Sequence, residues 1–172
     1  MKKLAVVYFP KLNLDKIDTF REKYDPGWKI IPPHITIVSP VSEISENQLI
    51  EHVESTIKDV GPFSIHLTGL TKTSDNCLFL LVKEGAEAIV DLHDKLYSGI
   101  LHPYIPVEYL FEPHITLGEF GTRDDSFDLC NKVYAEAQNL NFDITCDFDT
   151  VSVIKGDGLS PAKIIKTICL QS

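Results

Sequence analysis

A five-residue motif, Pro-His-Ile-Thr followed by an aliphatic residue, occurs twice in this chain, at residues 33–37 and 113–117. Each copy occupies the same position in a similar predicted series: strand, helix, motif strand, helix, strand. With only two copies and a long period, the repeat does not fit a solenoid. A chain built this way is predicted to fold as a duplicated α+β unit.

Hydrophobic periodicity and turn residues predict the individual elements. Helices are marked by apolar residues at helical spacing and strands by alternation or short buried runs. In the first half these are a strand over 4–9, a helix from 13 or 15 to 24, the motif strand 34–38, a helix over 45–60 and a strand over 63–70. In the second half they are strand 77–82, helix 84–101, motif strand 115–117, helix 124–140, a long strand 142–154, the turn 155–158 and strand 162–170.

The length of 172 residues fits a single domain. We therefore predict one α+β domain over 1–172 with a duplicated, bilobal fold. Its two pseudo-symmetric lobes would span about 1–75 and 76–172. Two antiparallel sheets would face a central cleft, with the helices outside and the two motifs on the cleft floor.

Strand geometry decides which motif residues share a face. Side chains alternate between the two faces of a strand, so His34 and Thr36 point the same way while the residues between and after them point to the core. The same alternation pairs His114 with Thr116. If the pseudo-twofold axis brings the strands together, one site holds two imidazoles and two hydroxyls.

Such a set suits cleavage of a phosphodiester without a metal ion. One His can act as the base that activates the nucleophile and the other as the acid that protonates the leaving oxygen, because an unperturbed imidazole titrates near pH 6.5. Thr hydroxyls can donate to the non-bridging oxygens, where charge grows in the transition state. The sequence has no HExxH motif and no close set of ligands of the kind that zinc hydrolases use.

The two His-x-Thr-x motifs resemble the paired signature of the 2H phosphoesterases, which include 2′-5′ RNA ligase-like proteins and cyclic phosphodiesterases. Residues 23–34 look particularly like the small bacterial branch of this superfamily. The resemblance implies that His34 is the proton donor, that His114 is the proton acceptor, and that Thr36 and Thr116 bind the phosphate. The residues alone leave open which His plays which role, since substrate orientation decides it.

The resemblance also implies an activity. It is metal-independent hydrolysis of a 2′,3′-cyclic phosphate or a related ribose phosphodiester of a small nucleotide or RNA end, with reversible 2′-5′ ligation as the same chemistry. No cofactor is expected. The alternative is a binding module that holds a nucleotide or phosphate between the same four residues without turnover.

Residues outside the two motifs are weaker candidates for the site. A third His-x-Thr at His66 and Thr68 lacks the preceding Pro and lies outside the repeated position, which indicates an accessory role at most. Tyr104, Tyr109 and Phe111 approach the second motif and could stack on a base, although packing is the favoured interpretation. Lys29 and Lys72 are further candidates for phosphate binding.

Charge and composition narrow the range of possible binding partners. The net charge of −9 and the presence of only two arginines argue against broad binding to nucleic-acid backbones. We expect a small nucleotide or RNA end as substrate and no stable nucleic-acid complex. The longest apolar runs are too short to span a bilayer, and none of the four cysteines forms a CxxC pair. A cytoplasmic monomer is expected.

Overall fold

The computed structural model describes residues 2–106, 110–122 and 124–171. Tyr109, one of the predicted aromatic candidates, lies outside this part of the chain. The strands are β1 (Lys3–Tyr8), β2 (Ile35–Val41), β3 (Phe63–Lys72), β4 (Cys77–Val82), β5 (His114–Glu119), β6 (Asp143–Phe148), β7 (Thr150–Gly156) and β8 (Lys163–Cys169). The helices are α1 (Asp15–Tyr24), α2 (Glu46–Ile57), α3 (Ala86–Leu96), the 3₁₀ helix η1 (Gly99–Tyr104) and α4 (Ser126–Leu140).

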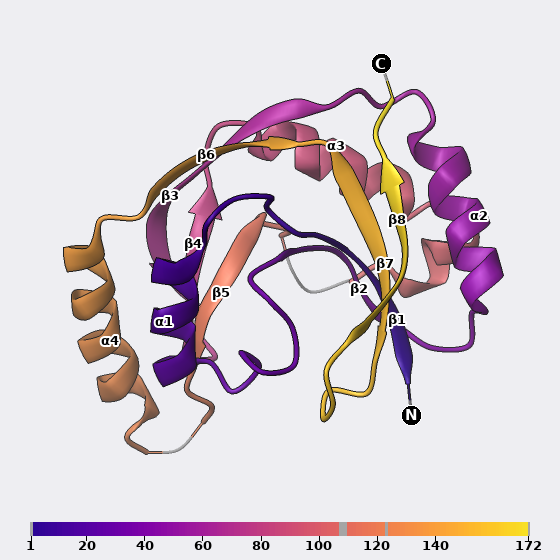
Figure 1. Ribbon diagram of the computed structural model, residues 1–172. Helices are drawn as coiled ribbons and strands as arrows, with labels where there is room; N and C mark the ends of the chain where they lie inside the picture. The colour runs from indigo at the N-terminus through magenta and orange to yellow at the C-terminus, as the bar shows by residue number, and fades with distance from the viewer. Residues whose placement is uncertain (1, 107–109, 123, 172) are drawn as a thin grey trace.

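All eight strands belong to one curled sheet in the order β6-β3-β4-β5-β2-β1-β7-β8 (Figure 1). Every neighbouring pair is antiparallel. The α+β class is therefore confirmed, whereas the two separate sheets expected from the sequence are not. The two motif strands, β2 and β5, join the halves of the sheet, and their ladder has a single registered pair, Ile35 with Ile115. Sequence periodicity could not reveal this junction, because hydrogen bonding between strands is a non-local property.

Strands distant in the sequence lie side by side in this sheet. β3 pairs with β4 and β6, while β7 pairs with β1 and β8. The N-terminal helix α1 packs against β5, which carries the second motif, and α4 packs against β3 and β4. On the other half, α3 contacts β2 and α2 contacts β8. The two halves of the sequence are thus interleaved in space.

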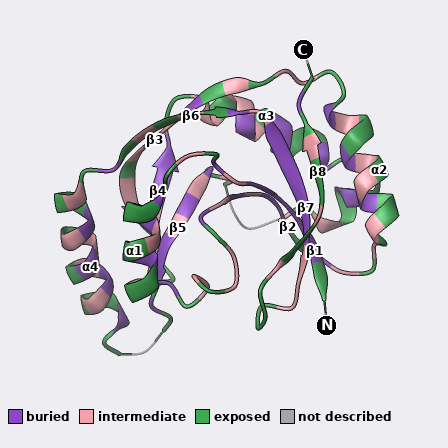
Figure 2. Cartoon of the chain, viewed as in Figure 1, coloured by how far each residue is buried: buried purple, intermediate pink, exposed green. Residues whose placement is uncertain are grey.

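The helices and one face of the sheet enclose the hydrophobic core. From β1 this core takes Leu4, Val6 and Tyr8, and the helices contribute residues such as Ile17 and Leu49. The alternate residues of β1 point to the other face, where Ala5, Val7 and Ile154 form a small separate apolar cluster. Burying a large aliphatic side chain stabilises the fold by about 1.5–3 kcal/mol, so the main core dominates. In Figure 2 the strands β5 and β7 are largely buried, whereas the helices also carry exposed residues on their outer sides.

Two predicted elements are divided in the structure. The helix predicted over 84–101 ends at Leu96, and a 3₁₀ helix begins at Gly99, whose positive φ of 51° is incompatible with a continuing α-helix. The long strand predicted over 142–154 separates at Asp149 into β6 and β7. Here the chain passes from the partner of β3 to the partner of β1, and the Tyr8 hydroxyl donates to the Asp147 carbonyl at 2.7 Å.

Candidate active site

The two motifs lie on neighbouring strands in the middle of the sheet. Since Ile35 is paired with Ile115 in an antiparallel register, continuing that register sets His34 opposite Thr116 and Thr36 opposite His114. The intervening Ile35 and Ile115 are almost completely buried in the main core. All four predicted polar residues are half-buried and share the other face of the sheet. Strand alternation therefore works as predicted in both copies.

Both imidazoles are held in the same way. Nδ1 of His34 is 2.8 Å from the carbonyl oxygen of Pro32, and Nδ1 of His114 is 2.6 Å from the carbonyl oxygen of Glu112. A carbonyl can only accept, so each Nδ1 carries the hydrogen. In the neutral ring this leaves Nε2 as the unprotonated nitrogen, free to accept a proton. The Pro residue within each motif thus separates the His from the carbonyl that orients it.

Burial lowers the pKa of both His residues. The pKa of His34 falls to about 4, mainly because desolvation disfavours the charged ring, and the nearby Arg21 and His114 lower it further. The hydrogen bond to Pro32 and the Asp25 carboxylate act in the opposite direction. Desolvation also lowers the pKa of His114, and its hydrogen bond to Glu112 and the Glu112 carboxylate oppose the change. Without a bound anion, both rings are neutral at pH 7.

The surroundings of the two His residues differ. The Phe79 ring stacks on His114 with a centroid separation of 3.6 Å and an interplanar angle of 14°. Phe9 is the aromatic neighbour of His34, but its centroid is 6.1 Å away and its ring is tilted by 54°. The second imidazole is therefore covered on one face by a stacked ring, whereas Phe9 does not stack on the first.

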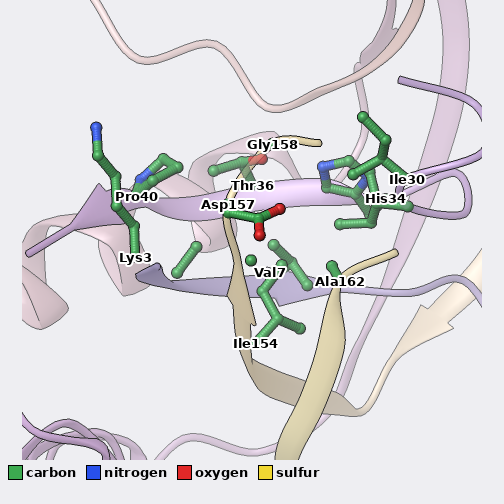
Figure 3. Close-up of a pocket in the computed structure, with 13 residues that line it drawn as sticks. Lys3, Val7, Ile30, His34, Thr36, Pro40, Ile154, Asp157, Gly158 and Ala162 are labelled. Atoms are coloured by element: carbon green, nitrogen blue, oxygen red, sulfur yellow. The ribbon is translucent and has the colours of Figure 1, made fainter. Parts of the chain in front are cut away.

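A cavity of about 370 Å³ opens beside the first motif (Figure 3). His34 and Thr36 line it together with residues of β1, of the loop before the motif and of the β7–β8 hairpin. The other lining residues are Lys3, Ala5, Val7, Ile30, Ile31, Pro40, Ile154, Gly156, Asp157, Gly158 and Ala162. In Figure 3 Lys3 and His34 lie at opposite ends of this cavity. Its volume is within the usual range of small-molecule sites, roughly 300–1,000 Å³.

A buried ion pair supports the loop before the first motif, and sequence reasoning missed it. Arg21 is only 2% exposed; its Nε donates to Oδ2 of Asp25 at 2.8 Å, and its Nη2 forms an ion pair with the same oxygen at 2.8 Å. Nη2 also donates to the carbonyl of Ile31, and Oδ1 of Asp25 accepts from the backbone N–H of Gly27. The signal in the sequence is an Arg and an Asp at i and i+4 across a helix end, a spacing that allows the two side chains to meet.

Other candidates make contacts of their own. His66 lies 2.5 Å from the Asp143 carboxylate across the β3–β6 ladder. The Tyr104 hydroxyl donates to the Ser42 carbonyl, and Phe111 stacks on His93, which supports the packing interpretation of these aromatics. The Lys29 ammonium lies over the ring of Trp28, and Lys72 donates to Asn131.

The described part of the chain has neither a candidate metal-binding cluster nor a helix that could span a membrane. Within residues 2–106, 110–122 and 124–171, no three His, Cys, Asp or Glu side chains are grouped so that they could hold a metal ion. No helix in the same ranges combines the length and the hydropathy needed to cross a membrane.

Comparison with known proteins agrees with the motif evidence. Residues 9–159 match the model of the 2′-5′ RNA ligase superfamily. The chain is 31% identical over 132 residues to a Bacillus licheniformis protein named "Putative phosphoesterase", which covers 74% of this chain and 76% of the relative. It is 32% identical over 157 residues to a Geobacillus protein of the same description, with 84% of each chain covered.

Solved structures share the fold. E. coli LigT complexed with 3′-AMP matches with a TM-score of 0.65 at 15% identity over 99% of both chains. TT0787 of Thermus thermophilus matches with a TM-score of 0.63 at 17% identity over 98% of this chain and 97% of that one. With the match to the family model and the two bacterial relatives, these findings show that the chain belongs to the 2′-5′ RNA ligase superfamily of 2H phosphoesterases.

Proposed function

We propose that this chain is a metal-independent phosphodiesterase that opens 2′,3′-cyclic phosphates or related ribose phosphodiesters of small nucleotides or RNA ends. One observation carries the proposal. His34 and His114 lie on adjacent strands, each bound through Nδ1 to a backbone carbonyl, so that two equivalent Nε2 atoms are available on one face of the sheet. A general acid and a general base on a rigid support are what such a hydrolysis needs.

The proposed reaction places the phosphate between the two rings. His114 takes a proton from water through Nε2 as the water oxygen forms its bond to phosphorus. His34 gives a proton through Nε2 to the ribose oxygen as the bond between phosphorus and that oxygen breaks. In the ligation direction a ribose hydroxyl replaces water as the nucleophile, with His114 and His34 in the same roles, and the two roles are reversed when the ligated bond is cleaved again.

Thr36 and Thr116 would bind the non-bridging oxygens. If the antiparallel register of Ile35 with Ile115 continues by one residue on each side, each Thr lies across from the His of the other motif and would meet the phosphate beside a transferring proton. Hydrogen bonds to oxygens whose charge increases in the transition state lower the barrier selectively. These four groups supply a base, an acid and two donors.

The lowered pKa of His34 has a consequence for this scheme. An acid with a pKa of about 4 carries a proton in only a small fraction of free molecules at pH 7. A bound phosphodiester anion would raise the pKa, because an opposite charge nearby favours the imidazolium. The substrate would therefore create the acid form on which its own cleavage depends.

The relatives support the same chemistry. Two are named as phosphoesterases, and LigT has been crystallised with 3′-AMP and with phosphate. We also propose that the two strand–motif units descend from one duplicated unit, with lobes of about 1–75 and 76–172. Corresponding strands β1 and β4 flank the motif strands β2 and β5, as such a duplication would require.

The test is a panel of 2′,3′-cyclic mononucleotides, cyclic-phosphate RNA ends and 2′-5′ linked oligonucleotides, assayed with EDTA present. Hydrolysis that persists in EDTA and falls by at least about 10²-fold in both His34→Ala and His114→Ala supports the proposal. Activity that survives either substitution would exclude the acid–base scheme. Tight nucleotide binding with no turnover would instead identify a binding module.

A further inference from the structure

The strands beside the two motif strands, β1 and β4, carry side chains of different size at corresponding positions, and this difference accounts for the cavity beside His34. Val7 of β1 pairs with Thr36, and Phe79 of β4 pairs with Thr116, so Val7 and Phe79 hold corresponding positions beside the two motifs. Beside the second motif the large Phe79 ring fills the space and stacks on His114. Beside the first motif the smaller Val7 leaves the cavity open.

The cavity wall is mainly apolar. It comprises the small cluster of Ala5, Val7 and Ile154, with Ile31 and Ala162 packed against it. Two of the polar groups at its edge are already bound within the protein. The Ala162 N–H donates to the Ile30 carbonyl, and Oδ1 of Asp157 accepts from the N–H groups of Leu159 and Ser160. The wall thus offers mainly apolar contact area.

We propose that this cavity is a specificity site that receives the nucleobase of the substrate and recognises it by shape and apolar contact. The inference rests on the proposed function and adds the substrate class. His34 and Thr36 belong to both the cavity and the proposed phosphate site, so a group attached to the bound ribose phosphate reaches the cavity directly. A planar uncharged ring buries apolar area there without needing hydrogen bonds.

Shape recognition has a consequence for selectivity. Strong discrimination between bases needs buried donors and acceptors that one base satisfies and another leaves unpaired. Since the wall is mainly apolar and its Ala162 N–H and Asp157 Oδ1 are already bound within the protein, we expect all four bases to be accepted with similar efficiency. A cyclic phosphate without a base would lose the apolar contacts.

The experiment compares kcat/KM for the four 2′,3′-cyclic mononucleotides with that for glycerol 1,2-cyclic phosphate, which has the reacting group but no base. The four nucleotides should agree within about threefold, and each should exceed the base-free compound by at least about tenfold, mainly through KM. Equal efficiency for the base-free compound overturns the inference and leaves the proposed function intact. A preference of more than about hundredfold for one base overturns recognition by shape.

Two variants fill the cavity from different sides. Ala162→Trp adds a large ring from the hairpin, and Val7→Phe adds one from the sheet. Either should reduce the preference for nucleotides over the base-free compound by about tenfold. Lys163→Trp is the matched control, because this exposed neighbour is absent from the cavity lining and should retain the preference. An unchanged preference in both folded filling variants contradicts the inference.

Binding distinguishes this inference from the proposed function. If no cyclic phosphate is hydrolysed, the proposed function fails, and calorimetric titration with adenosine 3′-monophosphate and with inorganic phosphate still tests the cavity. Tighter binding of the nucleotide by at least about tenfold in the unmodified chain, lost in Ala162→Trp, supports the base site. Equal affinities overturn it.

Discussion

Arg21 and Asp25 form a buried ion pair that fixes the loop leading to His34. The pair spans the end of α1, and the same guanidinium donates to the Ile31 carbonyl, one residue before the Pro32 carbonyl that orients the imidazole. Asp25 also accepts from Gly27 N–H within the loop. One buried pair thus connects the helix on β5 to the position of the first catalytic candidate.

Removing the carboxylate should be costly. Asp25→Ala leaves the Arg21 guanidinium buried without its counter-charge, and its Nη1 already lacks a hydrogen-bond partner. Breaking one side of a buried pair lowers the free energy of unfolding by about 3–5 kcal/mol. Urea unfolding at pH 7 measures this. Asp18→Ala is the control: the Asp18 side chain is half-exposed and its carboxylate lies 3.8 Å from Arg21 Nη1, so a loss below about 1 kcal/mol is expected.

Stability should depend on the protonation of His34. Its pKa is about 4 in the folded chain and near 6.5 when unfolded, so between these values the unfolded state binds more protons. The free energy of unfolding should therefore fall as the pH is lowered from about 6.5 to 4, by at most about 3 kcal/mol from this group. His34→Asn should flatten the dependence, as followed by urea unfolding at pH 7 and pH 5. An equally steep loss in the variant would contradict the assignment.

Anion binding should be accompanied by proton uptake. Since burial holds both imidazoles neutral, a phosphate between them shifts their pKa upward and draws protons from the buffer. Calorimetry of phosphate binding at pH 6.5 in buffers of different ionisation enthalpy should show uptake of a fraction of a proton or more. The uptake should decrease in His34→Ala and in His114→Ala. Binding without buffer dependence would place the anion away from the rings.

Stacking of the Phe79 ring on His114 should contribute to catalysis. Phe79→Leu keeps an apolar side chain and removes the stacked face, which is worth about 0.5–1.5 kcal/mol, so kcat/KM should fall by roughly two- to tenfold. The acid limb of the pH–rate profile should shift with it. Phe9→Leu is the matched control, because the larger separation and tilt of that ring from His34 predict a smaller change. Equal effects of the two substitutions would refute a specific role of stacking.

Local patterns determined much of this protein. The alternation of apolar and polar residues in both motifs predicted that His34 and Thr36, and likewise His114 and Thr116, share a face, because side-chain direction in a strand follows from the backbone alone. Ser45 as the cap of α2 was also predictable, since its contacts lie within one turn of the helix.

Tertiary structure decided the rest. The pairing of Ile35 with Ile115 and the single sheet depend on contacts between residues distant in the sequence. So do the positions of β3, beside β4 and β6, and of β7, beside β1 and β8. Hydrophobic periodicity carries no information about such contacts. The Arg21–Asp25 pair became recognisable only in the folded structure. The same is true of the difference in size between Phe79, which lies beside the second motif, and Val7, which lies beside the first. The sequence alone thus determined which residues could act, and packing between strands decided that they meet and that only the first motif borders this cavity.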